Sequence, residues 1–569
     1  MATATVSLPI TRGGAFLIEN RAPSEIFTVE DLSEEHLAIA RTVDAFWARE
    51  VEPNIEAIQH HEPGVAREIV RKAAALGLTA IVIPEKFGGM ELDLTSMMVA
   101  AEHFSGDASW SGWQGAHVGI GTLPILFFGN EQQKAKYLPK LASVEMLAAY
   151  ALTEPQAGSD ALAARTRADL SPDGTHYILN GQKMWITNGG SADLFTVFAK
   201  VGGEKFTAFL VERGMGVKSG AEEHKMGIKG SSTTALYFDN VPVPAENVLG
   251  QIGRGHIIAF NILNIGRLKM GPATVGGAKR VLATCLAYAR DRKAFGSPIA
   301  AFGAIQHKLA EMAIRIYAAE SISWRTVGLV ESRLRDFSWE APNASETMLN
   351  AVEEFATECS IVKVCTSEML DFVVDEGVQI HGGYGFHQDY AVERAYRDSR
   401  INRIFEGTNE INRLLIPGML LKRAARGRLD LPRAAETVSI QDEDDRLVAN
   451  AKQIALLCLN AARSAYPEGL EQQQEILMHI ADIVIETYVM ESSLLRSRKL
   501  PNPTPIVPVL LRDAMGRIEL SARNVLAAVA GEDQLPTLRT LAYYRPVNTV
   551  DHRRRIAARL LQAQKYVVV

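Results

Sequence analysis

Apolar residues recur at helical spacing along the first part of the chain, from residue 33 to about residue 150. Within LAIARTVDAFW, one apolar stripe is formed by Leu37, Ala40, Val43 and Trp47. Steps of three and four residues keep side chains on one face of a helix, because a helix turns once in about 3.6 residues. The pattern therefore predicts an N-terminal helical domain over residues 30–149.

The pattern changes between residues 150 and 250. The segments HYILNGQKMWI, ADLFTVFAKV, FTAFLVER and TALYFDNVPV are short, rich in β-branched or aromatic residues, and separated by Gly, Asn or Asp. Such segments are typical of strands joined by turns. We expect a compact β-domain over residues 150–250.

Helical patterning returns after residue 251. The stripe formed by Ile305, Leu309, Met312 and Ile316 is typical of a packed bundle helix and predicts a helical domain over residues 251–425. Residues 426–447 are polar with an acidic run, which favours a linker. A further helical region is expected over residues 448–569, without a recognisable chemical motif.

Composition narrows the class of protein. The 569 residues carry a formal net charge of −6, so no basic field favours nucleic acid as a partner. The scattered cysteines Cys285, Cys359, Cys365 and Cys458 indicate neither a metal site nor a disulfide framework and favour a reducing compartment. No apolar run of about 18 residues and no secretory signal are apparent. A cytoplasmic location is expected.

The stretch RIFEGTNEI, residues 403–411, carries the most suggestive chemistry. Glu406 follows the apolar pair Ile404 and Phe405, and apolar surroundings raise the pKa of a carboxyl towards that of a useful base. Gly407 permits close approach of a ligand to the backbone, and Thr408 can cap the following helix. On these residues alone, a proton-abstracting site and an ordinary helix boundary with an exposed Glu406 are equally good interpretations.

One stretch of the predicted β-domain offers groups for a planar heterocycle. In YALTEPQAGSD, Pro155 and Gly158 fix a turn that carries short hydroxyl side chains. The alternative is a plain Gly/Pro loop. In WITNG, Trp185 follows an alternating run and could be a core residue that ends a strand.

Two stretches of the helical part suit a dinucleotide. In RKAFG, Arg292 offers a planar fork for pyrophosphate, while the alternative is a helix C-terminus capped by Gly296. In QIHGGYG, paired glycines allow close backbone approach but also form ordinary turns. This stretch lacks the G-x-G-x-x-G pattern, so no Rossmann unit is implied. His381 is expected to be structural or on the surface rather than catalytic.

RIFEGTNEI resembles the catalytic signature of the acyl-CoA dehydrogenase family, flavoenzymes that remove two hydrogens from a fatty acyl thioester. The other four stretches match in the family's order, so the resemblance covers roughly residues 30–425. It implies a multidomain α+β fold with an N-terminal helical domain, a central β-barrel-like domain and a C-terminal four-helix-bundle domain. The helical region after residue 448 is then an extra C-terminal domain. The resemblance also implies FAD as the cofactor and Glu406 as the catalytic base.

The resemblance assigns FAD contacts to residues of all five stretches. Thr187 would hydrogen-bond near flavin N5, and Ser159 would lie near both flavin and substrate. Arg292 and Phe295 would reach the FAD of a neighbouring subunit, which implies a homo-oligomer, with a dimer favoured. The full set of implied FAD residues is Tyr150, Leu152, Thr153, Ser159, Trp185, Thr187, Arg292, Phe295, Gln306, Gln379, Gly383, Thr408 and Glu410.

Some members of the family carry the base on an earlier helix, just before a substrate-contacting arginine. That position is Gly266 in NILNIGR, so Glu406 is the only matching candidate for the base. NILN-x-GR and HKMGIKGSSTTALYFDNVPVPAENVLG resemble the very-long-chain branch. By this resemblance Asn264, Arg267, Ser159 and Gly407 contact the substrate, whereas the alternative for Arg267 is an ion pair on the helix surface.

The resemblance implies α,β-dehydrogenation of long- or very-long-chain acyl-CoA to trans-2-enoyl-CoA in fatty acid β-oxidation. Glu406 would take the pro-R α-proton and flavin N5 the β-hydride, with an electron-transferring flavoprotein as the expected acceptor. An acyl-CoA oxidase and an assembly or scaffold protein are the alternatives. Members of the very-long-chain branch bind membranes peripherally, in the mitochondrial matrix, but the acidic segment 431–447 weakens that expectation. Chain length, branching and acceptor stay open.

Overall fold

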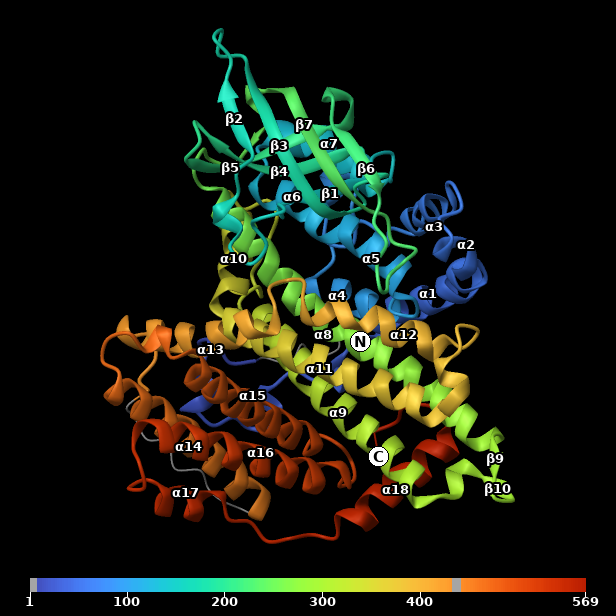
Figure 1. The fold of residues 1–569 in the computed structure, drawn as a ribbon, viewed down its shortest axis with the longest axis vertical. Coiled ribbons are helices and arrows are strands. Elements are labelled where there is room, and N and C mark those ends of the chain that lie inside the picture. The colour runs from blue at the N-terminus through green and yellow to red at the C-terminus, as the bar shows by residue number, and fades with distance from the viewer. Residues whose placement is uncertain (1–7, 432–441, 569) are drawn as a thin grey trace. The chain divides into compact units, whose positions relative to one another are not determined.

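The computed structural model describes residues 8–431 and 442–568. The chain divides into two compact units. Unit 1 comprises the residues up to 33 together with 270–335 and 354–569, and unit 2 comprises 34–269 and 336–353. Helices dominate both units and one large sheet lies in unit 2, so the predicted α+β, multidomain class is confirmed (Figure 1).

Unit 2 begins with short helices. The predicted stripe is largely confirmed, because Ala40, Val43 and Trp47 are buried. Leu37 is exposed instead. Leu37, Ala40 and Val43 are spaced by three residues, and each such step falls about 60° short of a full helical turn. The three side chains therefore drift around the helix, and Leu37 lies at the edge of the stripe. The helices are α1 Glu34–Phe46, α2 Ile55–Gln59, α3 Val65–Ala74, α4 Leu94–His103, α5 Ala108–Ala116, α6 Leu123–Phe128, α7 Glu131–Ala142 and, at the junction with unit 1, α10 Ala344–Glu354.

The sheet of unit 2 falls where β-patterning predicted it. Its strands are β1 Ala148–Ala151, β2 Arg167–Leu170, β3 His176–Thr187, β4 Leu194–Val201, β5 Lys205–Glu212, β6 Lys218–Glu222, β7 Thr233–Pro244 and β8 Val248–Leu249. The strand order is β6-β7-β3-β2-β4-β5-β8, and β1 pairs in parallel with β4. The pairing of β1 with β4 fixes the start of the loop that follows β1, which carries the first predicted FAD stretch.

Among its described residues, unit 1 is helical apart from one short hairpin. The predicted bundle stripe is confirmed, because Leu309, Met312 and Ile316 are buried and Ile305 is half-buried. The elements are the second part of α8 Gly255–Asp291, β9 Lys293–Ala294, β10 Ser297–Pro298, α9 Gly303–Glu331, α11 Ala356–His381, α12 Ala391–Ser399, α13 Asn409–Ala425, α14 Glu443–Ala465, α15 Gln474–Ser497, α16 Ile506–Val529, α17 Leu535–Ala542 and α18 Thr549–Ala563. The first part of α8, up to residue 269, belongs to unit 2.

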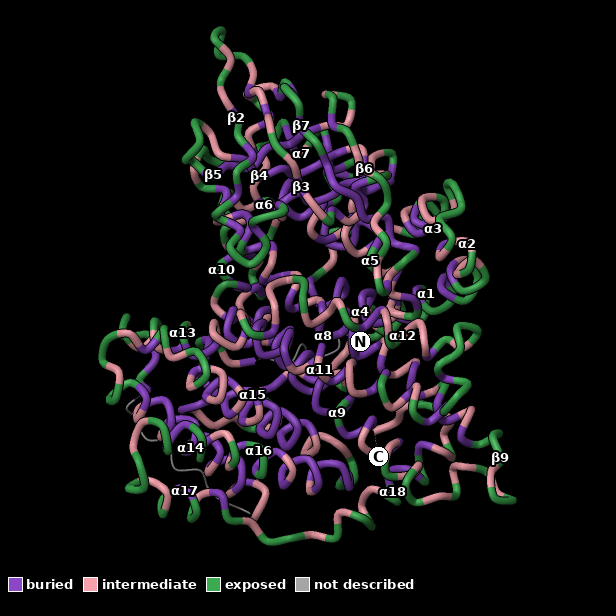
Figure 2. The backbone as a smooth tube through the Cα atoms, in the orientation of Figure 1, coloured by how far each residue is buried: buried purple, intermediate pink, exposed green. Residues whose placement is uncertain are grey.

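The C-terminal helices share one apolar core with the bundle helices of unit 1. Helices α9, α11, α14, α15 and α16 all contribute buried residues to this core (Figure 2). Buried charges are paired across it, with Arg325 bonded to Glu491 at 2.7 Å and Arg496 to Glu320 at 2.7 Å. Of the predicted linker, residues 432–441 lie outside the described residues, and α14 already begins at Glu443.

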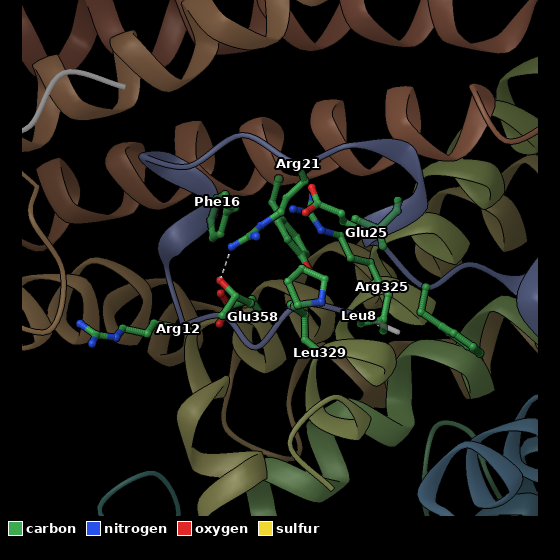
Figure 3. Close-up of a pocket in the computed structure, with 13 residues that line it drawn as sticks. Leu8, Arg12, Phe16, Arg21, Glu25, Arg325, Leu329 and Glu358 are labelled. Carbon is green, nitrogen blue, oxygen red and sulfur yellow. Dashed lines mark hydrogen bonds between the residues drawn. The ribbon is translucent and has the colours of Figure 1, made fainter. Parts of the chain in front are cut away.

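The N-terminal segment 8–33 is fastened to the C-terminal helices of unit 1. Lys452 Nζ donates to the carbonyl oxygen of Glu19 at 2.7 Å, and Arg496 pairs with Glu30 at 2.8 Å. A small pocket lies between this segment and helices α9 and α11, with Arg325 and Glu358 among its lining residues (Figure 3). None of the predicted site residues lines this pocket.

Candidate active site

The proposed base lies in a turn with an unusual backbone. Glu406 and Gly407 separate the short 3-10 helix Arg400–Arg403 from α13. Both have positive φ, +58° for Glu406 and +81° for Gly407. The left-handed region costs a residue with a Cβ about 1–2 kcal/mol, whereas glycine adopts it freely. A glutamate held in this conformation marks a site where the surroundings fix the backbone.

Two side chains fix this turn. Thr408 is the N-cap of α13, and its Oγ1 accepts a hydrogen bond from the amide of Ile411 at 3.3 Å, which confirms the predicted cap. Asn412 Nδ2 donates to the carbonyl oxygens of Gly407 at 2.8 Å and Thr408 at 3.0 Å. Asn412 was missed by the sequence analysis, because an asparagine within a helical pattern looks like any other polar position.

The surroundings of Glu406 differ from the sequence prediction. Its Oε2 is shielded from solvent, but the preceding Ile404 and Phe405 are 48% and 40% exposed. These two side chains are therefore exposed rather than buried. Arg403 is engaged by Asp371 at 2.7 Å. Glu410, another predicted FAD residue, is exposed in the first turn of α13.

The loop after β1 joins the first two predicted FAD stretches in unit 2. Glu154 and Ala157 bond each other's backbone around Pro155, so the predicted turn is present. The amide of Met184 donates to the carbonyl oxygen of Thr153 at 2.9 Å, and Lys183 Nζ donates to that of Leu152 at 3.1 Å. The loop and β3 are thus held in one register.

A buried ion pair stabilises this loop. Lys183 Nζ lies 2.7 Å from Glu154 Oε1, and both side chains are buried. Glu154 also accepts hydrogen bonds from the amides of Arg165 at 2.6 Å and Thr166 at 3.0 Å. Burial raises the pKa of Glu154, but the charge of Lys183 and these hydrogen bonds outweigh it and hold the pKa below its usual value.

The same burial acts on the partner cation. It lowers the pKa of Lys183 to about 8, against the opposing attraction of Glu154. The pair is therefore ionised at neutral pH. This pair was not predicted from the sequence. The available signal was that Lys183 shares the inward face of β3 with Tyr177 and Leu179, where a lysine needs a buried anion.

Trp185 does not end a strand inside the core. It is 61% exposed with φ +56°, at a shift in the β3–β7 register between Lys183 and Ile186. A β-bulge re-aims a side chain, and here it turns the indole outward. Thr187 is half-buried and Ser159 is exposed, while Tyr150 and Leu152 are buried. An exposed indole ring beside short hydroxyl groups fits a planar, polar-edged cofactor such as a flavin.

The predicted substrate pair lies inside unit 2. Asn264 and Arg267 occupy neighbouring turns of α8, and Arg267 Nη1 donates to Asn264 Oδ1 at 3.0 Å. Both residues are buried, so Arg267 does not lie on the helix surface.

The third predicted FAD stretch forms a hairpin. Helix α8 ends at Asp291, and the two-residue turn between β9 and β10 consists of Phe295 with φ +51° and Gly296 with φ +80°. Gly296 therefore does not cap the helix. Positive φ at both central residues is typical of the tight hairpin turn whose twist matches its strands. Phe295 stands at the tip and is 96% exposed, as a side chain that contacts a separate molecule would be.

The third and fourth stretches meet in unit 1. The Arg292 guanidinium lies over the Tyr384 ring, 5.3 Å from its centroid. His381 is buried and stacks on Tyr288 with ring centroids 4.0 Å apart, so its predicted structural role is confirmed. Gln379 and Gly383 are exposed, and a Cβ on Gly383 would meet open space. Gln306 donates to the carbonyl oxygen of Ala300 at 3.0 Å. The open backbone and exposed aromatic group fit part of a dinucleotide.

The part of the chain that the structure describes holds neither a metal-binding group nor a membrane-spanning helix. No group of three or more His, Cys, Asp or Glu in residues 8–431 and 442–568 is placed to hold a metal ion. No helix in the described part of the chain combines the length and the apolar character that crossing a membrane requires.

Comparison with sequence families matches four segments of the chain to acyl-CoA dehydrogenases. The N-terminal domain family matches residues 33–145, and the middle domain family matches residues 149–241. The C-terminal domain family matches residues 253–421, and a second C-terminal domain family matches residues 450–542. The second C-terminal match covers helices for which the sequence had offered no motif.

Individual relatives agree with these matches. A probable acyl-CoA dehydrogenase of Bacillus subtilis is 46% identical, over 98% of this chain and 99% of its own length. The very long-chain specific acyl-CoA dehydrogenase of Rattus norvegicus is 43% identical over 62% of this chain and 53% of its own length. The crystal structure of an acyl-CoA dehydrogenase complexed with FAD from Bacillus anthracis has a TM-score of 0.96 at 48% identity, covering 98% of this chain and all of that one.

Proposed function

The chain belongs to the acyl-CoA dehydrogenase family, and we propose that it uses FAD to oxidise long- or very-long-chain acyl-CoA with Glu406 as the base. The observation that carries the assignment of the base is the strained turn at Glu406. There a carboxylate with a shielded Oε2 precedes a glycine and a capped helix. A backbone fixed in this way suits a group that must meet one C–H bond in one orientation.

The roles of the chain's own residues follow from this assignment. The Glu406 carboxylate takes the proton from the α-carbon, which is acidic only when the thioester carbonyl is polarised. The Glu406 backbone N–H supplies part of that polarisation, and Arg267 with Asn264 contacts the substrate. When bound, FAD supplies the acceptor for the two electrons and the hydrogen that leave the β-carbon. Trp185, Thr187 and Ser159 are proposed to contact FAD, and Arg292 and Phe295 are proposed to reach the FAD of a neighbouring subunit.

The finer parts of the proposal rest on resemblance. A preference for long chains is supported by the 43% identity to a very long-chain relative and by the helices after residue 443. The exposed Phe295 supports a homodimer in which the hairpin contacts the partner's cofactor. An electron-transferring flavoprotein as acceptor and a cytoplasmic location complete the proposal.

Glu406→Gln tests the base directly. The amide has nearly the same shape as the carboxylate but cannot take a proton. The variant should therefore retain FAD and lose anaerobic flavin bleaching by acyl-CoA by at least about 100-fold. Glu475→Gln, which changes an exposed glutamate on α15, is the matched control and should bleach at the wild-type rate. Wild-type bleaching by the Glu406 variant would exclude Glu406 as the base. Bleaching of the wild-type protein by acyl-CoAs from C4 to C20 tests chain length.

A further inference from the structure

We propose that Asn412 is a positioning residue for the proposed base: its side-chain amide holds the strained turn 406–408 and thereby fixes where the Glu406 carboxylate lies. This inference rests on the proposed function, because it gives Asn412 a role only relative to Glu406. Asn412 is fully buried within the first turns of α13 and donates to the carbonyl oxygens of Gly407 at 2.8 Å and Thr408 at 3.0 Å. The carbonyl oxygen of Glu406 lies 3.5 Å from the same nitrogen.

The chemistry of these contacts fixes the orientation of the amide. Carbonyl oxygens only accept hydrogen bonds, so the Asn412 side chain must turn its NH₂ group towards the turn. Its Oδ1 is then buried, and it has no hydrogen-bond partner among the described residues. An unsatisfied buried acceptor costs about 1–3 kcal/mol. An apolar residue that only filled this space would avoid the cost. The hydrogen bonds donated by the NH₂ group therefore explain why an asparagine occupies this position.

The turn needs such a donor. Glu406 has a left-handed φ of +58°, which its Cβ disfavours by about 1–2 kcal/mol. Relaxation of that strain would rotate the Cα–Cβ bond of Glu406 and displace the carboxylate at the end of the side chain. A displacement of about 1 Å in a catalytic group can lower a rate about 100-fold. Asn412 opposes the relaxation by tying consecutive carbonyl groups of the turn to one rigid amide.

The start of α13 is anchored independently of Asn412. Lys363 Nζ donates to Asn409 Oδ1 at 2.6 Å, and Asn409 Nδ2 donates to Glu368 at 2.9 Å. Arg413 holds Glu368 through two bonds, at 2.6 and 2.9 Å, and reaches Asp482 of α15 at 2.7 Å. Loss of the Asn412 amide should therefore loosen the turn without releasing the helix.

Asn412→Leu is the main test. Leucine has a similar volume, removes the donors and also removes the unsatisfied Oδ1. In purified holoenzyme mixed anaerobically with acyl-CoA, we expect the limiting bleaching rate to fall about 10- to 100-fold. The acyl-CoA concentration at half-maximal rate should stay within about threefold, and the FAD content should stay at the wild-type level. With α-dideuterated acyl-CoA the kinetic isotope effect should increase, because proton abstraction becomes slower relative to the other steps.

The controls separate positioning from general damage. Asn450→Leu makes the same change at an asparagine of α14 whose amide donates to the carbonyl oxygen of Leu541 in α17, and it should leave the rate and the isotope effect unchanged. Asn412→Asp keeps the shape and places a carboxylate against carbonyl oxygens, so it should slow bleaching at least as much as leucine. If the leucine variant does not fold, the aspartate variant gives the same readout.

Glu406→Gln, measured in parallel, separates the two proposals. Wild-type rates and isotope effects in both Asn412 variants, with Glu406→Gln inactive, would overturn the role of Asn412 and leave the proposed base in place. Full bleaching by Glu406→Gln would overturn the proposed function itself. A loss of FAD or of folding in the Asn412 variants, with unchanged kinetics in the remaining holoenzyme, would also overturn the positioning role.

Discussion

The loop 152–160 of unit 2 and the turn 406–408 of unit 1 both carry predicted chemistry on irregular backbone, but they are held in different ways. The loop is tied by the buried ion pair of Glu154 and Lys183. The turn is tied by the neutral amide of Asn412 and the hydroxyl of Thr408. A fixed charge within about 4–6 Å shifts the pKa of a carboxyl. The neutral side chains of Asn412 and Thr408 position Glu406 without adding a charge that would shift its pKa. The loop 152–160 carries no proposed base, so an ion pair can stabilise it without this effect.

The largest effect should come from breaking the buried ion pair of Glu154 and Lys183. Lys183→Met leaves Glu154 buried without its cation, which typically costs about 3–5 kcal/mol. We expect the free energy of unfolding in denaturant titrations to fall by about that amount. The FAD content of the purified protein should fall as well, because the carbonyl oxygen of Leu152 loses its donor.

Two variants show whether charge is the cause. Glu154→Gln combined with Lys183→Met removes both charges and should recover a large part of the lost stability. Lys136→Met breaks a more exposed pair with Glu212, at 2.9 Å in the same unit, and should cost about 1 kcal/mol or less. Equal losses in Lys183→Met and Lys136→Met would show that the loop is not held by its ion pair.

A second buried glutamate, Glu358, sharpens the contrast, because the charges of Arg423 and Arg325 lower its pKa less than burial raises it. Glu358 Oε1 accepts the amide of Gly14 at 2.7 Å, and burial raises the pKa of this carboxyl to about 7. The folded protein therefore retains a proton that the unfolded chain, with an ordinary pKa of 4.5, has already lost. The stability from this group is complete below pH 4.5 and is lost as pH rises through about 7.

Glu358→Gln should remove this pH dependence. Between pH 4.5 and 8, the wild-type protein should lose up to about 3 kcal/mol through Glu358, and the variant should not. Denaturant titrations at pH 5, 6, 7 and 8 measure the difference. Glu471→Gln, at an exposed glutamate of the same unit, should keep the wild-type slope. Parallel slopes in the wild-type protein and Glu358→Gln would mean that Glu358 is already ionised at pH 5.

The sequence predicted what depends on neighbours along the chain. The cap at Thr408 follows from a threonine placed just before a helical segment, and the apolar stripe 305–316 follows from spacing alone. Both features are decided within a few residues. The exposed Trp185 was not predicted, because a bulge depends on how β3 pairs with β7. The hairpin at Gly296 was not predicted either, since the same residues can end a helix or turn between two strands.

Contacts that form only in the folded structure could not be predicted from the sequence. Glu154 and Lys183 are 29 residues apart and meet only once the loop folds back on β3. Asn412 is close to Glu406 in sequence, but its role depends on the left-handed conformation of the turn, which no pattern of residue types revealed. Family resemblance identified the residues of the proposed chemistry. It did not assign Glu154, Lys183 or Asn412, which stabilise the backbone around them.

The smallest effect should come from removing the Thr408 cap, the weaker of the two neutral interactions that stabilise the turn 406–408. Thr408→Val keeps the shape of the side chain and removes the hydroxyl that accepts the Ile411 amide at 3.3 Å. Loss of an N-cap costs about 0.5–2 kcal/mol, and the length of this bond places the expected loss near 1 kcal/mol or below. Thr408→Ser keeps the hydroxyl and should retain most of the stability in the same denaturant titration. A loss from Thr408→Val as large as that from Lys183→Met would erase the contrast, because the turn would then depend on its cap as strongly as the loop depends on its buried charges.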